Sequence, residues 1–445
     1  MQKWAGGRFS FSVSCFLSPV SCCFSVLVLV SAVFLGAAFA QPAQVRALLT
    51  LADRVVVEVG ELRGLPAKTR VARGALSRAQ LGERIRARVR EEYTPAEVRA
   101  EGLLWLRLGL VPVGTRYGDL VFALLEEQVA GYYDTRDRRL FLASWLGPDL
   151  QAPTLAHEIE HALQDQHFGL GERLRALRDD ADARAALSAL AEGDGVAVMI
   201  DYLARGTGRD FTTMPDLAER LRAQSAGDAD QPVLASSPRA LRETLLFPYV
   251  AGVSFVRTLK VRGGWRAVDD AFRDPPASTE QVLHPERYLR RDPPIPVELP
   301  RITALEGTHD EVYRDVLGEF QVRLWLQETM EPADAVNAAA GWGGDRAIVL
   351  ARRGAPEAPP LGAVTVVLRS TWDSEDDARE AAAAFAMSIA ARHRGARSSR
   401  RPTRQAYCLP DGTAALVERR GREIVYVEGA PAEALEAVRR QAWGA

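Results

Sequence analysis

The chain has 445 residues, 47% of them hydrophobic, so it can bury a large core and form two or three domains. Lysine plus arginine (56) nearly balances aspartate plus glutamate (58). The chain has no excess of basic residues that could bind a phosphate backbone, so we expect no nucleic-acid partner. The arginine run from Arg392 to Arg404 has no interleaved aromatic residues and is typical of a solvated loop.

The first forty residues have the pattern of a secretory signal peptide. Lys3 and Arg8 precede the apolar stretch FSVLVLVSAVFLGAAFA, which ends in a small-x-small signal before Gln41. We therefore expect cleavage near Ala40 and a secreted or periplasmic mature protein. A retained segment is the alternative, because the stretch is almost long enough to span a bilayer. The sequence offers no other route to a membrane.

Cleavage would leave Cys408 as the single cysteine of the mature chain. An internal disulfide would then be impossible, and the fold would depend on its core or on a metal. Cys408 lies where an expected strand runs into a turn. We predict a buried apolar residue there rather than a nucleophile.

The first part of the mature chain reads as helices followed by a hairpin. Between residues 41 and 110 the apolar residues recur at three-and-four spacing, which predicts two or three helices. These helices could form a pro-segment that is removed by autoprocessing. Two short β-prone runs then predict a hairpin over residues 128–143.

Three further helices are expected after the hairpin. The first covers residues 153–168, because Pro153 suits a first helical position and Gly169 suits a stop. The second covers residues 179–205, with alanines and glycines that allow close helix packing. The third is expected to break near Pro248.

A proline-rich connection after residue 275 gives the clearest domain boundary. Beyond about residue 300, strand-like and helix-like segments alternate, and the Gly-rich stretch around Trp342 and Asp345 predicts a tight turn. The sequence therefore predicts an α+β protein: a signal peptide over 1–40, a mainly helical domain with a small hairpin or sheet over 41–299, and a smaller α+β domain over 300–445.

The stretch LAHEIEHALQDQHFG, residues 155–169, holds three of the six histidines of the chain. On a helix, residues four apart lie about 40° apart around the axis and about 6 Å along it, so His157 and His161 point the same way. Two such imidazoles can bind one Zn²⁺, which leaves positions for a third protein ligand and a water. Glu158 can then act as general base when that water attacks a peptide carbonyl.

The third ligand has three candidates. Glu192 lies on the helix expected over 179–205, which can pack across the first, and Asp194 is its near neighbour. His167 has the metzincin spacing, but Gln164 stands where that motif needs glycine. On a continuous helix His167 would lie about 9 Å beyond His161 and about 120° around the axis. We expect Glu192 as the ligand.

His157-Glu158-x-x-His161 followed by Glu192 resembles the gluzincin pattern of thermolysin-like metallopeptidases. The stretches HEIEHALQDQHF, ALAEGDG and STEQVLHPERYL, with GWGGDR, resemble a group of poorly characterised secreted bacterial zincin-like proteins, over about residues 120–290. The resemblance implies a zincin-like domain with zinc on these three ligands and Glu158 as base. Thermolysin's longer glutamate signature is absent, so Glu192 is inferred rather than matched.

The zincin resemblance also implies a strand at the sheet edge that pairs with the substrate backbone above the active-site helix. Either strand of the hairpin could serve, and Tyr132 or Tyr133 would line a pocket or pack in the core. A donor for the developing oxyanion is also needed. His284 is the candidate in STEQVLHPERYL, together with Tyr249 and Tyr202.

Two functions follow from this reading. The first is a secreted or periplasmic zinc peptidase with peptide or protein substrates. The second is a cell-envelope binding protein that keeps a zincin-like fold and hydrolyses nothing.

Overall fold

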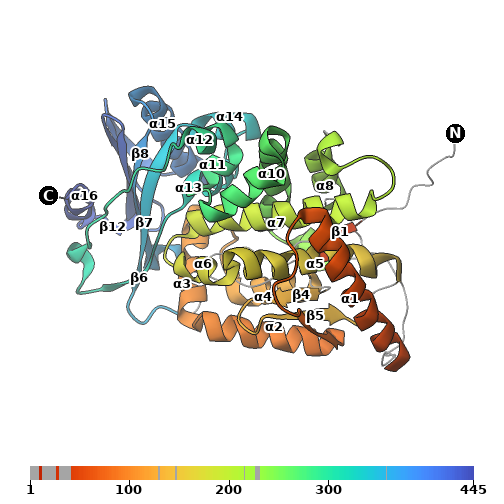
Figure 1. The fold of residues 1–445 in the computed structure, drawn as a ribbon. Helices are drawn as coiled ribbons and strands as arrows, with labels where there is room; N and C mark the ends of the chain where they lie inside the picture. Colours follow the sequence, from red (N-terminus) through yellow and green to blue (C-terminus); the bar gives the residue numbers. More distant parts are fainter. Residues whose placement is uncertain are drawn as a thin grey trace.

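The computed structural model describes residues 10–12, 27–29, 42–128, 131–145, 148–214, 216–225, 231–356 and 358–444. Within the expected signal peptide it describes two short strands that pair antiparallel, β1 (Ser10–Ser12) and β2 (Leu27–Leu29). The rest of that segment, including the expected cleavage site at Ala40, lies outside the described residues. The protein combines helices with sheets, and its largest sheet is C-terminal (Figure 1).

Helices dominate the chain between residues 42 and 290, with one three-stranded sheet among them. The elements are α1 (Pro42–Arg63), β3 (Ala72–Leu76), α2 (Arg78–Glu92), α3 (Pro95–Leu108), α4 (Tyr117–Gln128), β4 (Gly131–Asp134), β5 (Arg139–Ala143), α5 (Pro148–Phe168), α6 (Leu170–Ala176), α7 (Ala181–Leu203), η1 (Phe211–Thr213), α8 (Leu217–Ser225), α9 (Pro232–Ser236), α10 (Arg239–Arg273), α11 (Thr279–Leu283) and α12 (Pro285–Arg290).

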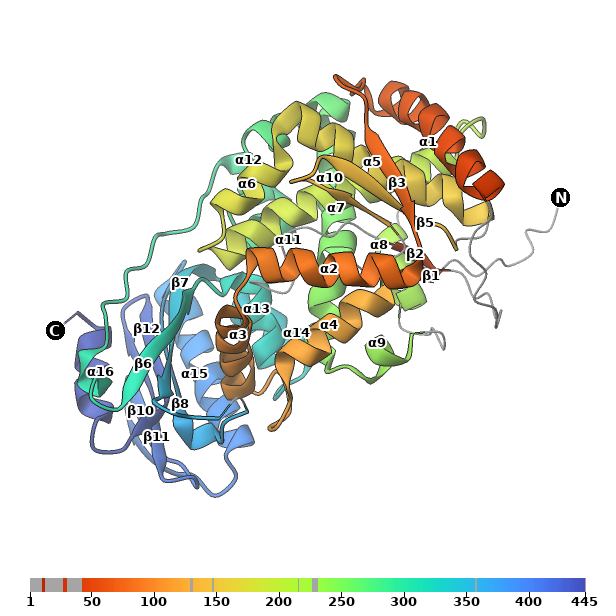
Figure 2. The ribbon, with the colours of Figure 1, turned by 90° about the horizontal axis from the view of Figure 1, so that it is seen from below.

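The predicted hairpin is confirmed as β4 and β5, whose register pairs Tyr133 with Leu140. A third strand, β3, pairs parallel to β5, so β5 is central and β4 lies at the edge of the sheet. β3 falls in the region predicted to be wholly helical, and that part of the prediction is wrong. A five-residue run becomes a strand here because a buried partner strand lies beside it. Figure 2 shows β3 between α1 and the hairpin.

The predicted active-site helix forms, but it begins earlier than expected. α5 starts at Pro148, so Pro153 lies inside it rather than at its first position. Proline has no N–H, so the helix loses only one hydrogen bond here, the one to the carbonyl oxygen of the residue four positions earlier. The helix ends at Phe168, where Gly169 adopts a φ of 67°, as predicted.

The predicted break at Pro248 is wrong, because α10 continues through that residue. The backbone becomes non-helical at Gly263 and Gly264 instead, and Gly264 has a φ of 66°, which glycine adopts without a Cβ penalty. Among the described residues, α10 is the one helix long and apolar enough to cross a membrane. Since 61% of its apolar window is buried, we interpret it as a core helix packed on α7.

The C-terminal part contains a seven-stranded antiparallel sheet in the order β6-β7-β8-β12-β11-β10-β9. Its elements are η2 (Thr303–Leu305), β6 (His309–Asp315), α13 (Gly318–Leu326), α14 (Pro332–Ala339), β7 (Trp342–Arg352), η3 (Leu361–Ala363), β8 (Val364–Trp372), α15 (Glu375–Arg392), β9 (Arg397–Arg401), β10 (Arg404–Cys408), β11 (Thr413–Arg420), β12 (Glu423–Pro431) and α16 (Leu435–Ala442). The strands and helices predicted beyond residue 300 are present.

Three local predictions for this part are wrong. The Gly-rich stretch at Trp342 starts strand β7 rather than a turn, and Asp345 is buried there, accepting hydrogen bonds from Leu317 N–H and the Trp342 indole. The arginine run is exposed as predicted over Arg397–Arg401, but it is not a loop. Arg392 ends α15, Arg397–Arg401 form β9, and Arg404 starts β10, which pairs with β9. Cys408 is exposed, since strand alternation buries its neighbour Tyr407.

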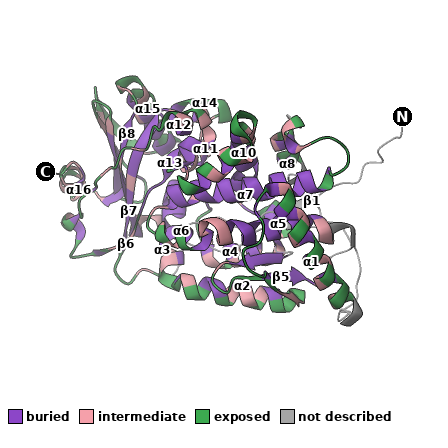
Figure 3. Cartoon of the chain, viewed as in Figure 1, coloured by how far each residue is buried: buried purple, intermediate pink, exposed green. Residues whose placement is uncertain are grey.

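Both faces of the large sheet are covered. Residues on one face, such as Ile348 and Val425, pack against α16, while those on the other, such as Val349 and Tyr426, join the main core. α3 contacts β6, β7 and β8, so a helix from the first part of the chain packs on the C-terminal sheet. The apolar core is therefore continuous between the two parts, and Figure 3 shows the buried α7 at its centre.

A buried ion cluster around Glu428 links α3 to this sheet. Glu428 accepts from Arg392 at 2.7 and 2.9 Å and from His393 at 2.6 Å, and Arg107 of α3 lies 3.4 Å away. Burial alone would raise the pKa of Glu428, but Arg392 and Arg107 outweigh it and hold the pKa well below 4.5. The carboxylate is therefore charged in the folded protein.

Glu428→Gln should destabilise the protein by about 3–5 kcal/mol near neutral pH, because two buried guanidinium groups lose their anion. The folded-state pKa of Glu428 is below the usual 4.5, so its charge contributes stability that is fully present above pH 4.5. This stability is lost as the pH falls from 4.5 towards the folded-state pKa. The deficit should therefore shrink below about pH 4.5. Urea denaturation across pH measures it, with exposed Glu375→Gln as control. A deficit independent of pH would contradict this assignment.

Candidate metal centre

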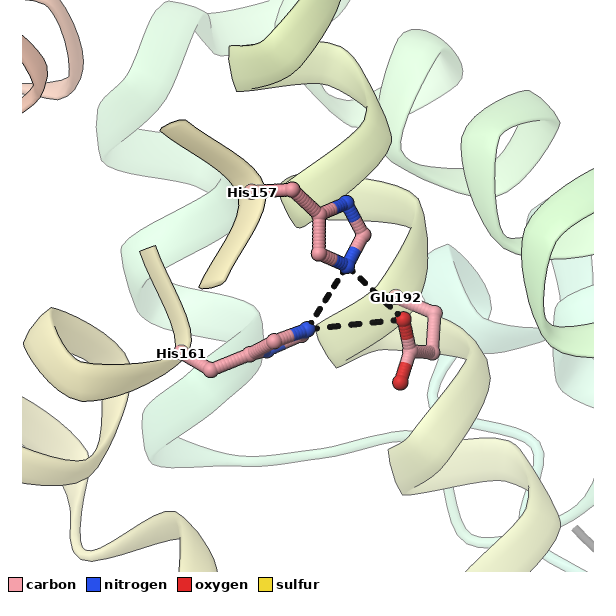
Figure 4. Close-up of side chains that lie close together, drawn as sticks. All are labelled: His157, His161 and Glu192. Atoms are coloured by element: carbon pink, nitrogen blue, oxygen red, sulfur yellow. Dashed lines mark hydrogen bonds and ion pairs between the residues drawn. The ribbon is translucent and has the colours of Figure 1, made fainter. Parts of the chain in front are cut away.

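The structure brings His157, His161 and Glu192 together (Figure 4). The histidines lie one turn apart on α5, and Glu192 comes from α7, which packs across it. One ligand atom from each residue lies within 4.8 Å of the other two. Glu192 Oε2 is 3.1 Å from His157 Nε2 and 3.4 Å from His161 Nε2, and the two ring nitrogens are 2.8 Å apart.

Glycines allow α7 to approach closely enough. A Cβ on Gly195 would lie 2.7 Å from Cε1 of the His157 ring, so only glycine leaves room for this imidazole. A Cβ on Gly193 would lie 2.2 Å from the backbone carbonyl carbon of Gly252, where α10 crosses α7. These two contacts fix the position of Glu192 between α5 and α10.

The group is closed to solvent. His157, His161 and Glu192 are at most 2% exposed. Burial lowers the pKa of His157, which keeps its imidazole neutral. Burial opposes charge on His161 as well, but Glu192 outweighs it and raises that pKa.

Glu158 lies beside the group without belonging to it. Its Oε2 accepts the backbone N–H of Tyr133 in β4 at 3.0 Å, and its Oε1 has no hydrogen-bond partner among the described residues. Burial and the nearby charge of Glu192 raise the pKa of Glu158 well above 4.5. The site thus contains a buried carboxyl group that binds a proton more readily than an exposed glutamate does.

The two other ligand candidates are elsewhere. Asp194 lies behind the group, where it accepts hydrogen bonds from Arg63 Nε at 2.9 Å and Gln164 Nε2 at 3.0 Å. His167 contacts the carbonyl oxygen of Pro66 at 2.8 Å on an exposed part of the protein. The helix continues past His161, so His167 turns away from the group as its angular position requires.

His284 is not brought to the group, and its choice as oxyanion donor is wrong. Its Nε2 lies 2.9 Å from Glu319, next to Gly318, which packs against Asp182 at the start of α7. Ten residues separate Asp182 from Glu192, or about 15 Å along the helix. The prediction failed because the sequence around His284 does not show which end of α7 this segment will contact.

Of the tyrosines predicted near the site, the structure places some beside the histidines and others away from them. Tyr202 donates to Glu58 Oε2, away from the histidines. Tyr249 on α10 is buried, and its ring centroid is 6.5 Å from that of His157, so it is the oxyanion candidate that the structure retains. Tyr132 and Tyr133 are buried in the core rather than lining an open pocket.

Sequence reasoning missed Gln164 and Arg63. His161 Nδ1 lies 2.9 Å from Gln164 Oε1, and this pair is three residues apart on one helix, so spacing could have indicated it. Arg63 reaches Asp194 across 131 residues of sequence, and no local pattern predicts such a contact.

A cavity of about 220 Å³ lies apart from this group, between α2, α3 and α4. Its lining includes Val89, Leu106 and Phe122, and none of the histidines. The cavity is therefore separate from the candidate metal centre. The strand β2 contacts α5, so removal of the expected signal segment would uncover part of that helix.

Comparison with known proteins adds little about this site. Residues 305–439 match a domain of unknown function, DUF8575, and this range contains all seven strands of the C-terminal sheet. The chain has no match among curated proteins. A crystal structure from Chloroflexus aurantiacus, described as a candidate hydrolase with a novel fold, is similar at 19% identity and a TM-score of 0.36, covering 57% of this chain and 91% of that one. So distant a likeness carries no functional argument.

Gly193→Ala should destabilise the protein by about 2–3 kcal/mol, because the new methyl group would overlap the α10 backbone. This loss exceeds the roughly 1 kcal/mol that alanine normally gains over glycine in a helix. Urea denaturation measures it, with Gly307→Ala as control, since Gly307 faces open space. A variant more stable than wild type would contradict the close α7–α10 crossing.

Proposed function

We propose that this protein is a zinc-dependent peptidase of zincin type, in which His157, His161 and Glu192 hold the metal and Glu158 is the general base. The observation that carries the proposal is the convergence of these three ligand atoms, within 4.8 Å, beside a fourth residue that is not a ligand. A purely structural zinc site would normally use four protein ligands. Three ligands leave one coordination position for chemistry.

The residues fit zinc in type and spacing. Ligand atoms of a tetrahedral zinc lie about 3.3 Å apart, given zinc–ligand distances of about 2.0–2.1 Å. The corresponding separations here are 2.8, 3.1 and 3.4 Å. Two imidazoles and one carboxylate also match the donors of hydrolytic zinc sites. A divalent cation would neutralise the charge of the buried Glu192.

Zinc, when bound, supplies a Lewis acid that activates water and polarises a substrate carbonyl. Glu158 moves the protons. Its unpartnered Oε1 can accept the proton of the attacking water, and the same carboxyl can pass that proton to the amine that leaves the cleaved bond. Tyr133 N–H holds the other oxygen and fixes the orientation of the carboxyl group.

The edge strand β4 suits an extended peptide substrate. Among the described strands β4 pairs with β5 alone, and Tyr133 N–H faces α5 rather than β5. A substrate strand added along this edge would run above the helix that bears His157. Tyr249, whose ring lies near that of His157, is our candidate donor to the oxyanion.

Access and location complete the proposal. A peptide reaches a group this deeply buried only if the covering segments open, and removal of the expected signal peptide would uncover part of α5. We propose that the mature protein acts outside the cytoplasm, where that peptide has been removed.

Purified wild-type protein should bind about one zinc per chain, and Glu192→Ala should bind it far more weakly. The loss should exceed the roughly 10–100-fold effect of losing a partner outside the ligand set, because a ligand itself is removed. Chelator competition and elemental analysis measure this. Exposed Glu172→Ala is the control and should bind zinc like wild type. Equal affinity in Glu192→Ala would remove Glu192 from the site.

Glu158→Gln should retain zinc and lose activity by about 10²–10⁴-fold, because the amide cannot accept a proton. Mass spectrometry of an unfolded protein or a peptide library after digestion measures cleavage. His167→Gln, on the same helix but directed away, should leave cleavage unchanged. Zinc-loaded wild type that cleaves nothing would instead favour the non-catalytic cell-envelope binding protein.

A further inference from the structure

Gln164 lies one helical turn after His161, and its amide has only one consistent orientation. The amide nitrogen lies 3.1 Å from the carbonyl oxygen of Ala191 and 3.0 Å from Asp194 Oδ2. A carbonyl and a carboxylate only accept hydrogen bonds, so the NH₂ group must face them. The amide oxygen therefore faces His161 Nδ1, at 2.9 Å.

This orientation sets the tautomer of His161. An amide oxygen can only accept, so Nδ1 of His161 must carry the proton that it donates. In the neutral ring, Nε2 then presents its lone pair towards His157 and Glu192. Nε2 is the nitrogen that a cation in this group needs.

The same chain of contacts continues away from the metal group. Asp194 Oδ1 accepts from Arg63 Nε at 2.9 Å, and the Arg63 side chain is fully buried at the end of α1. Arg63 also lies 2.8 Å from Asp269 and stacks 4.4 Å from the centroid of the Trp265 ring. Arg63 therefore holds Asp194, Asp194 holds Gln164, and Gln164 holds His161.

His157 has no equivalent support. Its Nδ1 has no hydrogen-bond partner among the described residues, and packing against Gly195 orients its ring. Of the two imidazoles, only His161 has a hydrogen-bond partner among the described residues at Nδ1, the ring nitrogen that faces away from the group. The metal affinity should therefore depend on Gln164, which is the residue that holds His161 from outside the ligand set.

We propose that Gln164 is a positioning residue of the metal centre, which presents Nε2 of His161 to the cation and is itself held by Asp194 and Arg63. This inference rests on the proposed zinc site. It adds α1 to the metal centre, because Arg63 is the last residue of that helix.

Zinc affinity of Gln164→Met tests this proposal. Methionine fills similar space but offers no amide, so zinc should bind about tenfold or more weakly. Chelator competition measures the affinity, and the thermal midpoint of the metal-free protein reports folding. Gln166→Met is the matched control, because Gln166 lies on the same helix and accepts from Lys68 N–H and Thr69 N–H instead. It should bind zinc like wild type.

If Gln164→Met does not fold, a double variant that combines Gln164→Glu with Asp194→Asn tests the proposal. Gln164→Glu alone sets two carboxylates against each other, and Asp194→Asn alone can turn its amide NH₂ towards the NH₂ of Gln164. The double variant restores a donor opposite an acceptor and keeps the net charge, while Glu at 164 still accepts from His161. It should bind zinc several-fold more tightly than Gln164→Glu alone.

The results separate this inference from the proposed function. Wild-type protein that binds no zinc would overturn the proposed function itself. Wild-type protein that binds zinc, with folded Gln164→Met within twofold of it, would overturn the role of Gln164 alone. A double variant that binds no more tightly than Gln164→Glu would overturn it equally.

Discussion

The close crossing of α7 over α5 is the constraint on which the rest of the structure depends. The two histidines belong to one helix, and the acid that completes the group belongs to another, so the distance between the helices decides whether they meet. Gly195 leaves room for the His157 ring, and Gly193 lets α10 press against α7 from the other side. A larger side chain at either position would move Glu192 away from the imidazoles.

Several acidic side chains are buried where α7 crosses α5, and their charges need compensation. Glu158, Glu160, Glu192 and Asp194 are all buried within a short distance along two helices, and Arg63 is the buried cation that faces two of them. Uncompensated charges in such a place are costly. A divalent cation beside Glu192 would offset part of this excess of acid. Burial, together with the nearby charges of Glu192 and Asp194, raises the pKa of Glu158 and of Glu160 well above 4.5.

The N-terminal helices are integral to the fold, which argues against reading residues 41–110 as a removable pro-segment. α1 contributes Arg63 and contacts both α5 and α7. β3 completes the sheet above α5, and α3 covers part of the C-terminal sheet. Cleavage after this segment would remove a buried cation, a paired strand and part of the continuous core.

The sequence by itself determined the elements that depend on local pattern. Helical periodicity placed α5 and α7, and the four-residue spacing set His157 and His161 on one face. Short β-prone runs predicted the hairpin and the strands β8 and β12 beyond residue 300. It also suggested Glu192, through its place on a second helix. Only the tertiary structure decided which acid meets the histidines, that Asp194 and His167 do not, that His284 lies near the far end of α7, and that Arg63 supports the group. These outcomes depend on contacts between residues far apart in the chain, whose energies come from packing and burial, and no local pattern of residues carries that information.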